Sequence, residues 1–376
     1  MKSVSWNEVR ARRLARGSLT ERASAEQLLD VVHETAGIHA QVMAAAELSL
    51  AGRVEGITQQ DVRDALWERR ELVKAWTLRG TLHLHPAGEL PLWHAAARAV
   101  SPNEPEELQA WVDPKGELHP ALGRDDVREI RAAVLDALDG RSLLREELAA
   151  EVVQRVGSKG RGRLLSGFMF FGATLCQGPP HGSKITLARP DQWVEPWDEV
   201  DEQEGLREVC RRYLRTYGPA TPNDFRQWFS SRQFEAADAR ALFASLQLED
   251  VDVEGHTAHV LAGDTSFPEP QQTVRLMPEY DVYVMGFRER DQLVPEEARR
   301  QVAAHRRGKY EGPAGVRFLM IDGIAAGLWE RKKRGKHVEL QVTPSRKLTR
   351  AERAAIDSEA ERIGAFLGLE PALTVG

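Results

Sequence analysis

The sequence has little cysteine and no long apolar run. Cys176 and Cys210 are the only two cysteines among 376 residues, too few for a disulfide framework or a four-cysteine zinc site. No apolar run approaches the roughly 20 residues that cross a bilayer. The opening residues, MKSVSWNEVRARRLAR, have no apolar segment behind their charges, unlike a secretory signal. We therefore expect a reduced, cytoplasmic protein with no membrane partner, in which both cysteines are core thiols.

The common catalytic motifs are absent as well. There is no GxxxxGK[ST] phosphate loop, no GxGxxG, no GxSxG elbow and no HExxH. The eleven histidines show no zinc spacing. His83 and His85 alternate on a predicted strand, where they could ligate a metal, but ordinary structural roles are favoured. We expect neither a metal nor a cofactor.

Charge is present in separate blocks. The 51 basic and 57 acidic residues give a net charge of −6, which taken alone disfavours nucleic acid. The acidic residues cluster at 195–208 and 235–254, whereas basic runs occupy 10–16, 158–163, 299–309 and 331–336. Each block is compatible with a solvated face, but four basic runs in an acidic chain favour DNA binding, with the basic runs facing DNA and the acidic blocks facing away. The candidate phosphate contacts are Lys159, Arg161, Arg163, Lys332, Lys333 and Arg334.

One pattern of helices followed by a β-hairpin occurs three times, at 24–85, 141–188 and 221–261. In the first copy, strands flank Arg79-Gly80; in the third, Thr221 and Pro222 mark a helix start. This order is typical of a winged helix, which binds DNA or serves as a protein-interaction module. With 42% hydrophobic residues, the chain can form a sizeable core, and we expect an α+β fold.

The C-terminal part is predicted to be rich in strands. Residues 274–287, 316–329 and 337–344 alternate as strands do, Asp322-Gly323 is a turn signal, and a closing helix runs from Thr349 to Gly368. A β-barrel-like element fits this pattern. The run 331–336, RKKRGK, lies between alternating segments and is placed at a hairpin tip. The expected domains are 1–100, 124–194, 203–262 and 273–376.

A short polar insertion, His39-Ala40-Gln41, lies in an apolar setting. It follows a helix ending near His33 and precedes a small-residue helix, 43–51, and Gly37 allows a sharp reversal between the two. Two residues apart on an extended segment, His39 and Gln41 are expected to project to one side. The residues alone favour local hydrogen bonding for this pair.

Four segments resemble, in order, the blocks of the AlkZ/YcaQ-like bacterial DNA glycosylases, a winged-helix family associated with repair of alkylated and interstrand-crosslinked DNA. The similarity extends from about residue 10 to 370. It implies tandem winged-helix motifs forming a C-shaped clamp with a C-terminal β-barrel-like element. The segments are LVKAWTLRGTLHL, RRYLRTYGPATPNDFRQW, VRLMPEYDVYVMGFRER and VRFLMIDGIAAGLW.

The resemblance also implies a catalytic pair at His39 and Gln41. Family members commonly carry Gln-x-Gln or Gln-x-Asp there; this chain keeps the glutamine at position 41 and resembles a less common His-x-Gln branch. A cationic N7-alkylpurine is a good leaving group, so the enzyme mainly places a water and stabilises an oxocarbenium-like sugar. Gln41 can orient that water, and His39 can accept its proton or act only by position. No lysine lies in this segment to form a Schiff base, which predicts a monofunctional hydrolase.

Several roles stay open at this stage. Arg79 and His83 are candidates for contacts near the lesion, although Arg79 could instead hold its hairpin through an ion pair. Asp281 could be structural or could orient an active-site group; the structural role is favoured. The predicted substrate is double-stranded DNA containing alkylated purines, bound by a nucleoid-associated monomer. The alternatives are a non-enzymatic winged-helix regulator and a protein-interaction scaffold.

Overall fold

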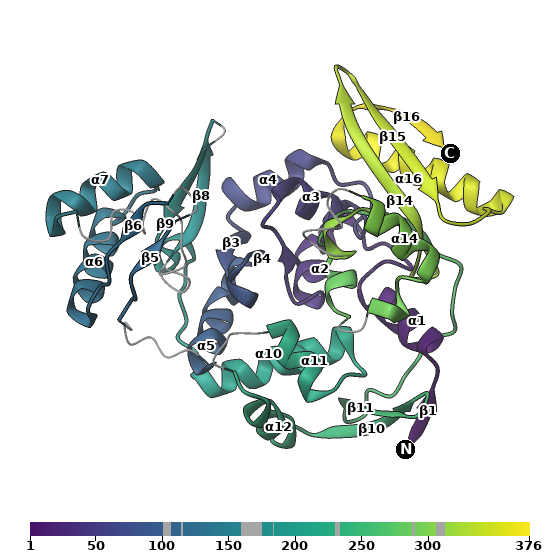
Figure 1. The fold of residues 1–376 in the computed structure, drawn as a ribbon, viewed down its shortest axis with the longest axis horizontal. Helices are drawn as coiled ribbons and strands as arrows, with labels where there is room; N and C mark the ends of the chain where they lie inside the picture. Colours follow the sequence, from purple (N-terminus) through teal and green to yellow (C-terminus); the bar gives the residue numbers. More distant parts are fainter. Residues whose placement is uncertain are drawn as a thin grey trace. The chain divides into compact units, whose positions relative to one another are not determined.

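The chain divides into two compact units (Figure 1). The computed structural model describes residues 1–100, 107–113, 116–158, 175–182, 184–229, 234–287, 290–305 and 313–376. Unit 1 joins two distant segments, Met1–Arg63 and Arg207–Gly376, and unit 2 is the intervening Asp64–Leu206. Both units mix helices and strands, so the expected α+β class is confirmed.

The N-terminal segment of unit 1 is mainly helical. Its first long helix begins at a capping box, in which the Ser5 hydroxyl accepts from the Glu8 N–H at 3.3 Å and the Glu8 carboxylate accepts from the Ser5 N–H at 2.8 Å. The elements are β1 (Lys2–Val4), α1 (Trp6–Arg16), α2 (Leu28–Glu34), β2 (Ile38–His39), α3 (Met43–Ala51) and α4 (Gln59–Trp67), the last of which continues into unit 2.

The middle of the chain follows the predicted order of helix, helix and hairpin. Thr221 caps its helix as expected, because its hydroxyl accepts from the Asp224 N–H at 3.2 Å. Strand β1 joins the hairpin in parallel, which makes a three-stranded sheet of order β1-β10-β11. The elements are α10 (Glu202–Tyr217), α11 (Pro222–Phe229), α12 (Ala236–Ala244), β10 (Leu248–Val253) and β11 (His256–Leu261).

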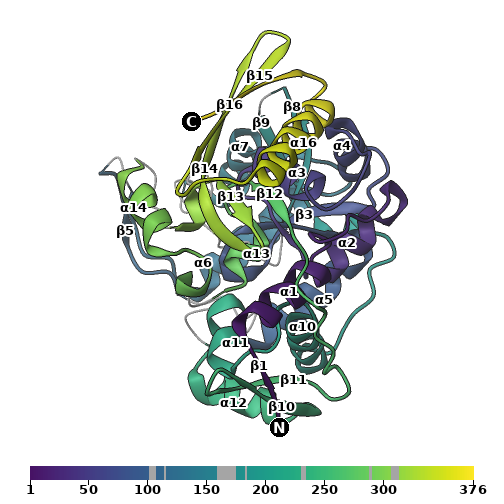
Figure 2. The same ribbon diagram turned by 90° about the vertical axis from the view of Figure 1, so that its right-hand side faces the viewer.

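A five-stranded sheet of order β12-β13-β14-β15-β16 forms the C-terminal part of unit 1. All neighbouring strands are antiparallel except β15 and β16. This order leaves β12 and β16 as edges, so the sheet is a curled half-barrel, and helix α16 lies alongside it in both views (Figure 2). The elements are β12 (Val274–Met277), α13 (Val282–Met285), α14 (Glu296–Ala304), β13 (Phe318–Ile321), β14 (Ile324–Arg334), β15 (His337–Pro344), α16 (Arg350–Leu367) and β16 (Glu370–Val375).

Local signals predicted most of this part correctly. Asp322 and Gly323 have φ values of +53° and +75° and form the turn between β13 and β14. The closing helix has Thr349 as its N-cap and Gly368, at φ +63°, as its C-cap. The prediction of continuous strand across 274–287 is wrong, because β12 ends at Met277 and α13 follows. The reason is local: Asp281 accepts a hydrogen bond from the Tyr283 N–H at 2.9 Å and thereby starts a helix.

Unit 2 is built on strands in the order β4-β3-β8-β9-β7. On one side, β9 contributes Leu187 to a core made mostly by α6 and α7; elsewhere Val73 and Cys176 pack with Trp193. The apolar segment RGRLLSGFMFFGATLCQG, 161–178, predicts a helix; it lies almost wholly outside the described residues, and its last three residues, 176–178, belong to strand β8. The elements are β3 (Leu72–Trp76), β4 (Leu82–Pro86), α5 (Leu90–Val100), β5 (Trp111–Val112), β6 (Leu118–His119), α6 (Arg124–Ala137), β7 (Leu143–Leu144), α7 (Arg145–Val156), β8 (Cys176–His181), β9 (Lys184–Ala188) and α9 (Pro190–Trp193).

Both cysteines are buried thiols, as expected, with Cys176 in unit 2 and Cys210 in unit 1. Burial raises the pKa of each thiol above its ordinary value, which keeps both protonated and unreactive. Among the helices that the structure describes, none combines the length and the hydropathy needed to cross a bilayer.

Candidate active site

The segment that carries His39 and Gln41 is a tight reversal between α2 and α3. Ala36 and Gly37 have φ values of +55° and +92°, and the Gly37 N–H donates to the Val32 carbonyl at 2.9 Å. The reversal predicted at Gly37 is therefore confirmed. Strand β2 follows directly, and α3 begins at Met43, so both candidate residues lie within a few residues of two helix ends.

Exposure separates the two candidate side chains. His39 is only 6% exposed and Ala40 is fully buried, whereas Gln41 is exposed. Strand β2 ends at His39, so the alternation expected of an extended segment does not continue to position 41. The expectation of a shared side is not supported by these exposures, because Gln41 is exposed to solvent and His39 is held in a packed environment.

Helix α10 holds the reversal between α2 and α3 in place through two hydrogen bonds. The Tyr217 hydroxyl donates to the Thr35 carbonyl at 2.8 Å, and the Thr216 hydroxyl donates to the Glu34 carbonyl. These bonds satisfy carbonyls at the C-terminal end of α2, which the helix itself leaves without partners. The position of the polar segment is therefore fixed by contacts from a helix more than a hundred residues further along the chain.

The ring of Tyr280 lies against His39. The two ring centroids are 5.3 Å apart with an interplanar angle of 44°, within the range of attractive aromatic contacts. Tyr280 lies between β12 and α13, and its backbone has φ +59°. The sequence alone did not identify this residue. Its only sequence signal is its place in the PEYD block, directly before Asp281.

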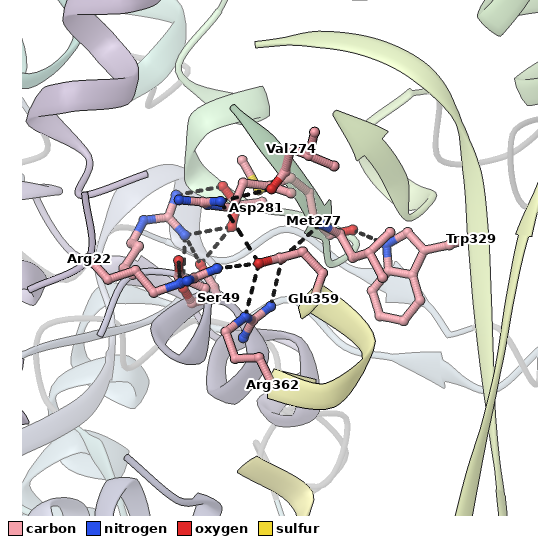
Figure 3. Close-up of polar contacts among 12 residues, drawn as sticks. Arg22, Ser49, Val274, Met277, Asp281, Trp329, Glu359 and Arg362 are labelled. Carbon is pink, nitrogen blue, oxygen red and sulfur yellow. Dashed lines mark hydrogen bonds and ion pairs between the residues drawn. The ribbon is translucent and has the colours of Figure 1, made fainter. Parts of the chain in front are cut away.

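Asp281, labelled in Figure 3, forms a buried ion pair with Arg53. The Arg53 guanidinium donates to both carboxylate oxygens, at 2.8 and 2.7 Å, and the Ser49 hydroxyl donates at 2.7 Å. Burial on its own would raise the pKa of Asp281, but the Arg53 charge and hydrogen bonds from Arg53, Ser49 and the Tyr283 N–H outweigh it and lower that pKa. Asp281 therefore stays ionised and ties α13 to the end of α3, which supports the structural role.

A second buried carboxylate ties α16 to the sheet (Figure 3). Glu359 accepts from Arg362 at 2.9 Å and from the Leu276 N–H at 3.1 Å, and it also pairs with Arg22. Burial opposes ionisation, but the surrounding arginines lower the pKa of Glu359 below its ordinary value. The candidate site thus lies beside a framework of charged groups inside unit 1.

The basic run 331–336 lies at the tip of the β14–β15 hairpin, as predicted. Lys332, Lys333 and Arg334 are all exposed, and Gly335, at φ +59°, turns the chain. Arg334 lies 3.5 Å from Glu339, a weak pairing for exposed groups. A groove of about 830 Å³ runs beside this hairpin, and its lining includes Arg317, Arg331, Lys332, Trp329, Glu330 and Gln341.

The basic run 10–16 is different, and the prediction that it faces DNA is wrong for two of its arginines. Arg12 is fully buried and pairs with Asp264 at 2.6 Å. Arg13 is 6% exposed, donates to the Pro219 carbonyl at 3.0 Å and covers the ring of Phe287 at 4.0 Å. These two cations join the N-terminal segment of unit 1 to its C-terminal segment.

The remaining candidates lie in unit 2. Arg79 is half-buried, in a turn with φ +53° between β3 and β4. His83 is 1% exposed and its Nδ1 lies 3.0 Å from the Thr81 carbonyl, while the His85 Nε2 lies 2.9 Å from the Thr77 hydroxyl. Both histidines therefore have structural surroundings. Lys159, Arg161 and Arg163 lie outside the described residues.

One group of side chains in the described part of the chain brings three potential metal ligands together. The ligand atoms of Asp113, Glu117 and His119, around the β5–β6 hairpin, lie within 4.8 Å of one another. The stacked ring of Trp111, 5.0 Å from that of His119, covers the histidine. Neither His39 nor Gln41 belongs to this group.

Comparison with known proteins identifies the family. The family described as DNA glycosylase AlkZ-like matches residues 32–366. An interstrand DNA cross-link repair glycosylase of Streptomyces sahachiroi is 30% identical over 383 residues, covering 97% of both chains. The solved structure of the DNA glycosylase AlkZ of Streptomyces sahachiroi is similar with a TM-score of 0.79 and 27% identity, covering all of both chains. The chain therefore belongs to the AlkZ-like DNA glycosylases, hydrolases that act on N-glycosyl bonds.

Proposed function

We propose that this enzyme hydrolyses the N-glycosidic bond of N7-alkylated, cationic purines in double-stranded DNA. The name of its relative, a cross-link repair glycosylase, extends the proposal to bulky adducts and interstrand crosslinks. The observation that carries it is the reversal between α2 and α3, which presents an exposed Gln41 beside a packed His39 in a chain of this family. Family membership sets aside the non-enzymatic regulator and the scaffold.

The chemistry requires little acid catalysis, because a cationic N7-alkylpurine departs as a neutral base. The protein's task is to place water near the anomeric carbon and to stabilise an oxocarbenium-like sugar. Gln41 supplies a carbonyl acceptor and two N–H donors, which together orient a water. His39, two residues before Gln41, accepts the proton of that water or fixes the geometry. No lysine occurs in 36–42, so the proposed enzyme forms no Schiff base and cuts no strand.

DNA binding is assigned to exposed cations. Lys332, Lys333 and Arg334 can release counterions from the phosphate backbone, and their exposure at a hairpin tip supports this role. In unit 2, the half-exposed Arg79 is a better candidate than the buried His83. The tandem winged-helix organisation, with domains 1–100, 124–194, 203–262 and 273–376, belongs to this proposal, as does action by a monomer on nucleoid DNA.

Release of 7-methylguanine from a defined duplex under single-turnover conditions tests the proposal. We expect wild-type protein to leave abasic sites, and the double variant His39→Ala/Gln41→Ala to lose activity by about 100-fold or more, the scale of a positioned catalytic group. Matched controls are His33→Ala on α2 and Gln60→Ala on α4, which change the same residue types in the same unit. No base release by wild type, or equal release by the double variant, would reject the proposal.

Strand cleavage is measured in the same reaction. A monofunctional enzyme leaves intact strands until alkali is added, and borohydride traps no covalent complex. A trapped complex would show that an amine elsewhere in the protein attacks the sugar and would exclude the water mechanism given above.

A further inference from the structure

The PEYD block between β12 and α13 contains an unusual backbone. Tyr280 has φ +59°, a conformation that is an outlier for a bulky residue and is disfavoured by about 1–2 kcal/mol. Its N–H donates to the Ala314 carbonyl at 2.6 Å. Backbones of this kind persist only where the surroundings hold them, and they concentrate at functional sites.

Both neighbours of Tyr280 are held by ion pairs. Glu279, 4% exposed, accepts from the Arg317 guanidinium at 2.6 and 2.7 Å. Asp281, 1% exposed, accepts from the Arg53 guanidinium at 2.8 and 2.7 Å. Two bidentate pairs anchor the side chains of the residues immediately before and after Tyr280. The residue with the left-handed conformation is therefore anchored on both sides.

The ion pair between Asp281 and Arg53 also connects the loop of Tyr280 to the segment that carries His39 and Gln41. Ser49 lies in the last turn of α3 and Arg53 lies two residues beyond its end, while the N-terminal end of this helix follows Gln41 by two residues. Asp281 binds both of them, so the loop that carries Tyr280 and the helix that follows the polar segment are joined by buried charge. The ring of Tyr280 then lies 5.3 Å from that of His39.

We propose that Tyr280 is a positioning residue for His39: its ring, held by the two flanking ion pairs, fixes the orientation of the imidazole in the active site. The assignment rests on the proposed function of His39. An imidazole that turns freely about its side-chain bonds presents its nitrogen to water only part of the time. A ring packed at a tilted angle against it removes those alternatives, and this preorganisation is what a catalytic group needs.

Three substitutions at Tyr280 distinguish the contribution of its ring from that of its backbone conformation. Tyr280→Phe keeps the ring, Tyr280→Leu removes it while keeping bulk, and Tyr280→Gly removes it and accepts φ +59° without strain. We expect release of 7-methylguanine within about two-fold of wild type for Tyr280→Phe and about ten-fold slower for the other two, with the effect in the rate and not in KM. Tyr280→Gly should unfold at no lower denaturant concentration than Tyr280→Leu, so its slower rate would not come from instability.

A spectroscopic readout tests the contact without any substrate. In DNA-free protein, the His39 ring protons should show a ring-current displacement, identified by the resonances that His39→Gln removes from the spectrum. We expect this displacement to persist in Tyr280→Phe and to disappear in Tyr280→Leu. An unchanged His39 spectrum in Tyr280→Leu, or full activity of that variant, would overturn the assignment. Absence of base release by wild type would instead overturn the proposed function, and the two failures are seen in different measurements.

Discussion

Two basic runs of unit 1 have opposite environments. In the run 10–16, Arg12 and Arg13 are buried in α1 and its surroundings, and Arg12 and Arg16 share the carboxylate of Asp264. In the run 331–336, three consecutive cations are exposed on a hairpin. Both runs are short clusters of lysine and arginine in the sequence, yet two arginines of the first are buried in the interior and three cations of the second are exposed to solvent.

The difference comes from the element that carries each run. Successive residues of a helix point about 100° apart, so four arginines within seven residues cannot all face solvent when the helix is packed on several sides. Those inside need acceptors, and unit 1 supplies a carboxylate and backbone carbonyls. At the tip of the β14–β15 hairpin the three cations are exposed, so they remain hydrated and able to meet phosphates.

The largest effect is expected from a buried cation of the first run. Arg12→Gln should lower the free energy of unfolding by about 2–3 kcal/mol, because hydrogen bonds to a charged group are removed inside the protein. Arg16→Gln is the matched control: it gives up the same acceptor, but its side chain is 35% exposed against 1% for Arg12, so we expect less than about 1 kcal/mol. Denaturant titration measures both. Equal decreases would remove the distinction between the two environments.

A buried histidine in unit 2, His94, extends this comparison of buried and exposed basic residues. His94 is 1% exposed, and neither ring nitrogen has a hydrogen-bond partner among the residues described. Burial, with a smaller contribution from Arg98, lowers the pKa of His94 to about 3. In the unfolded chain, His94 is protonated below about pH 6.5, whereas in the folded chain it stays neutral down to about pH 3. The free energy of unfolding therefore falls as the pH falls through that window.

Between pH 8 and pH 5, this histidine should lower the free energy of unfolding by roughly 2 kcal/mol, about 1.5 pKa units at 1.36 kcal/mol each. The measurement is denaturant unfolding at the two pH values for wild type and His94→Leu, which cannot titrate. A pH dependence of the same size in both proteins would assign the effect to other groups.

The smallest effect on folding is expected at the hairpin tip. Replacing Lys332, Lys333 and Arg334 together by glutamine should change the free energy of unfolding by no more than about 0.5 kcal/mol. The slope of log affinity for DNA against log salt should fall by up to about 2.7, near 0.9 for each phosphate that the protein no longer neutralises. Lys347→Gln, an exposed cation of the same unit outside the basic runs, is the control. An unchanged slope in the triple variant would place the phosphate contacts elsewhere.

Features set by neighbouring residues could be predicted from the sequence. The caps at Thr221 and Thr349, the Asp322-Gly323 turn and the hairpin tip at Gly335 depend on contacts within a few residues, and each lies where expected. The strand predicted across 274–287 is wrong at a position where the deciding signal is also local, the capping aspartate Asp281.

Features that join distant residues could not be predicted. Arg53 and Asp281 are 228 positions apart, and no pattern in either segment identifies the other as its partner. The same holds for the contact between His39 and Tyr280. Periodicity reports which face of an element is buried, but not which element covers it, so the candidate pair at 39 and 41 was identified without the tyrosine that packs against it.

The division of unit 1 between two ends of the chain has a consequence for synthesis on the ribosome. Strand β1 pairs with β10 through Lys2 and Val251, and Asp281 completes the ion pair of Arg53. The first 63 residues therefore leave the ribosome without most of their partners, while unit 2, a continuous stretch, can fold as soon as it emerges. Unit 1 can be completed only once residues 207–376 have emerged, and the contact between His39 and Tyr280 can form only at that stage.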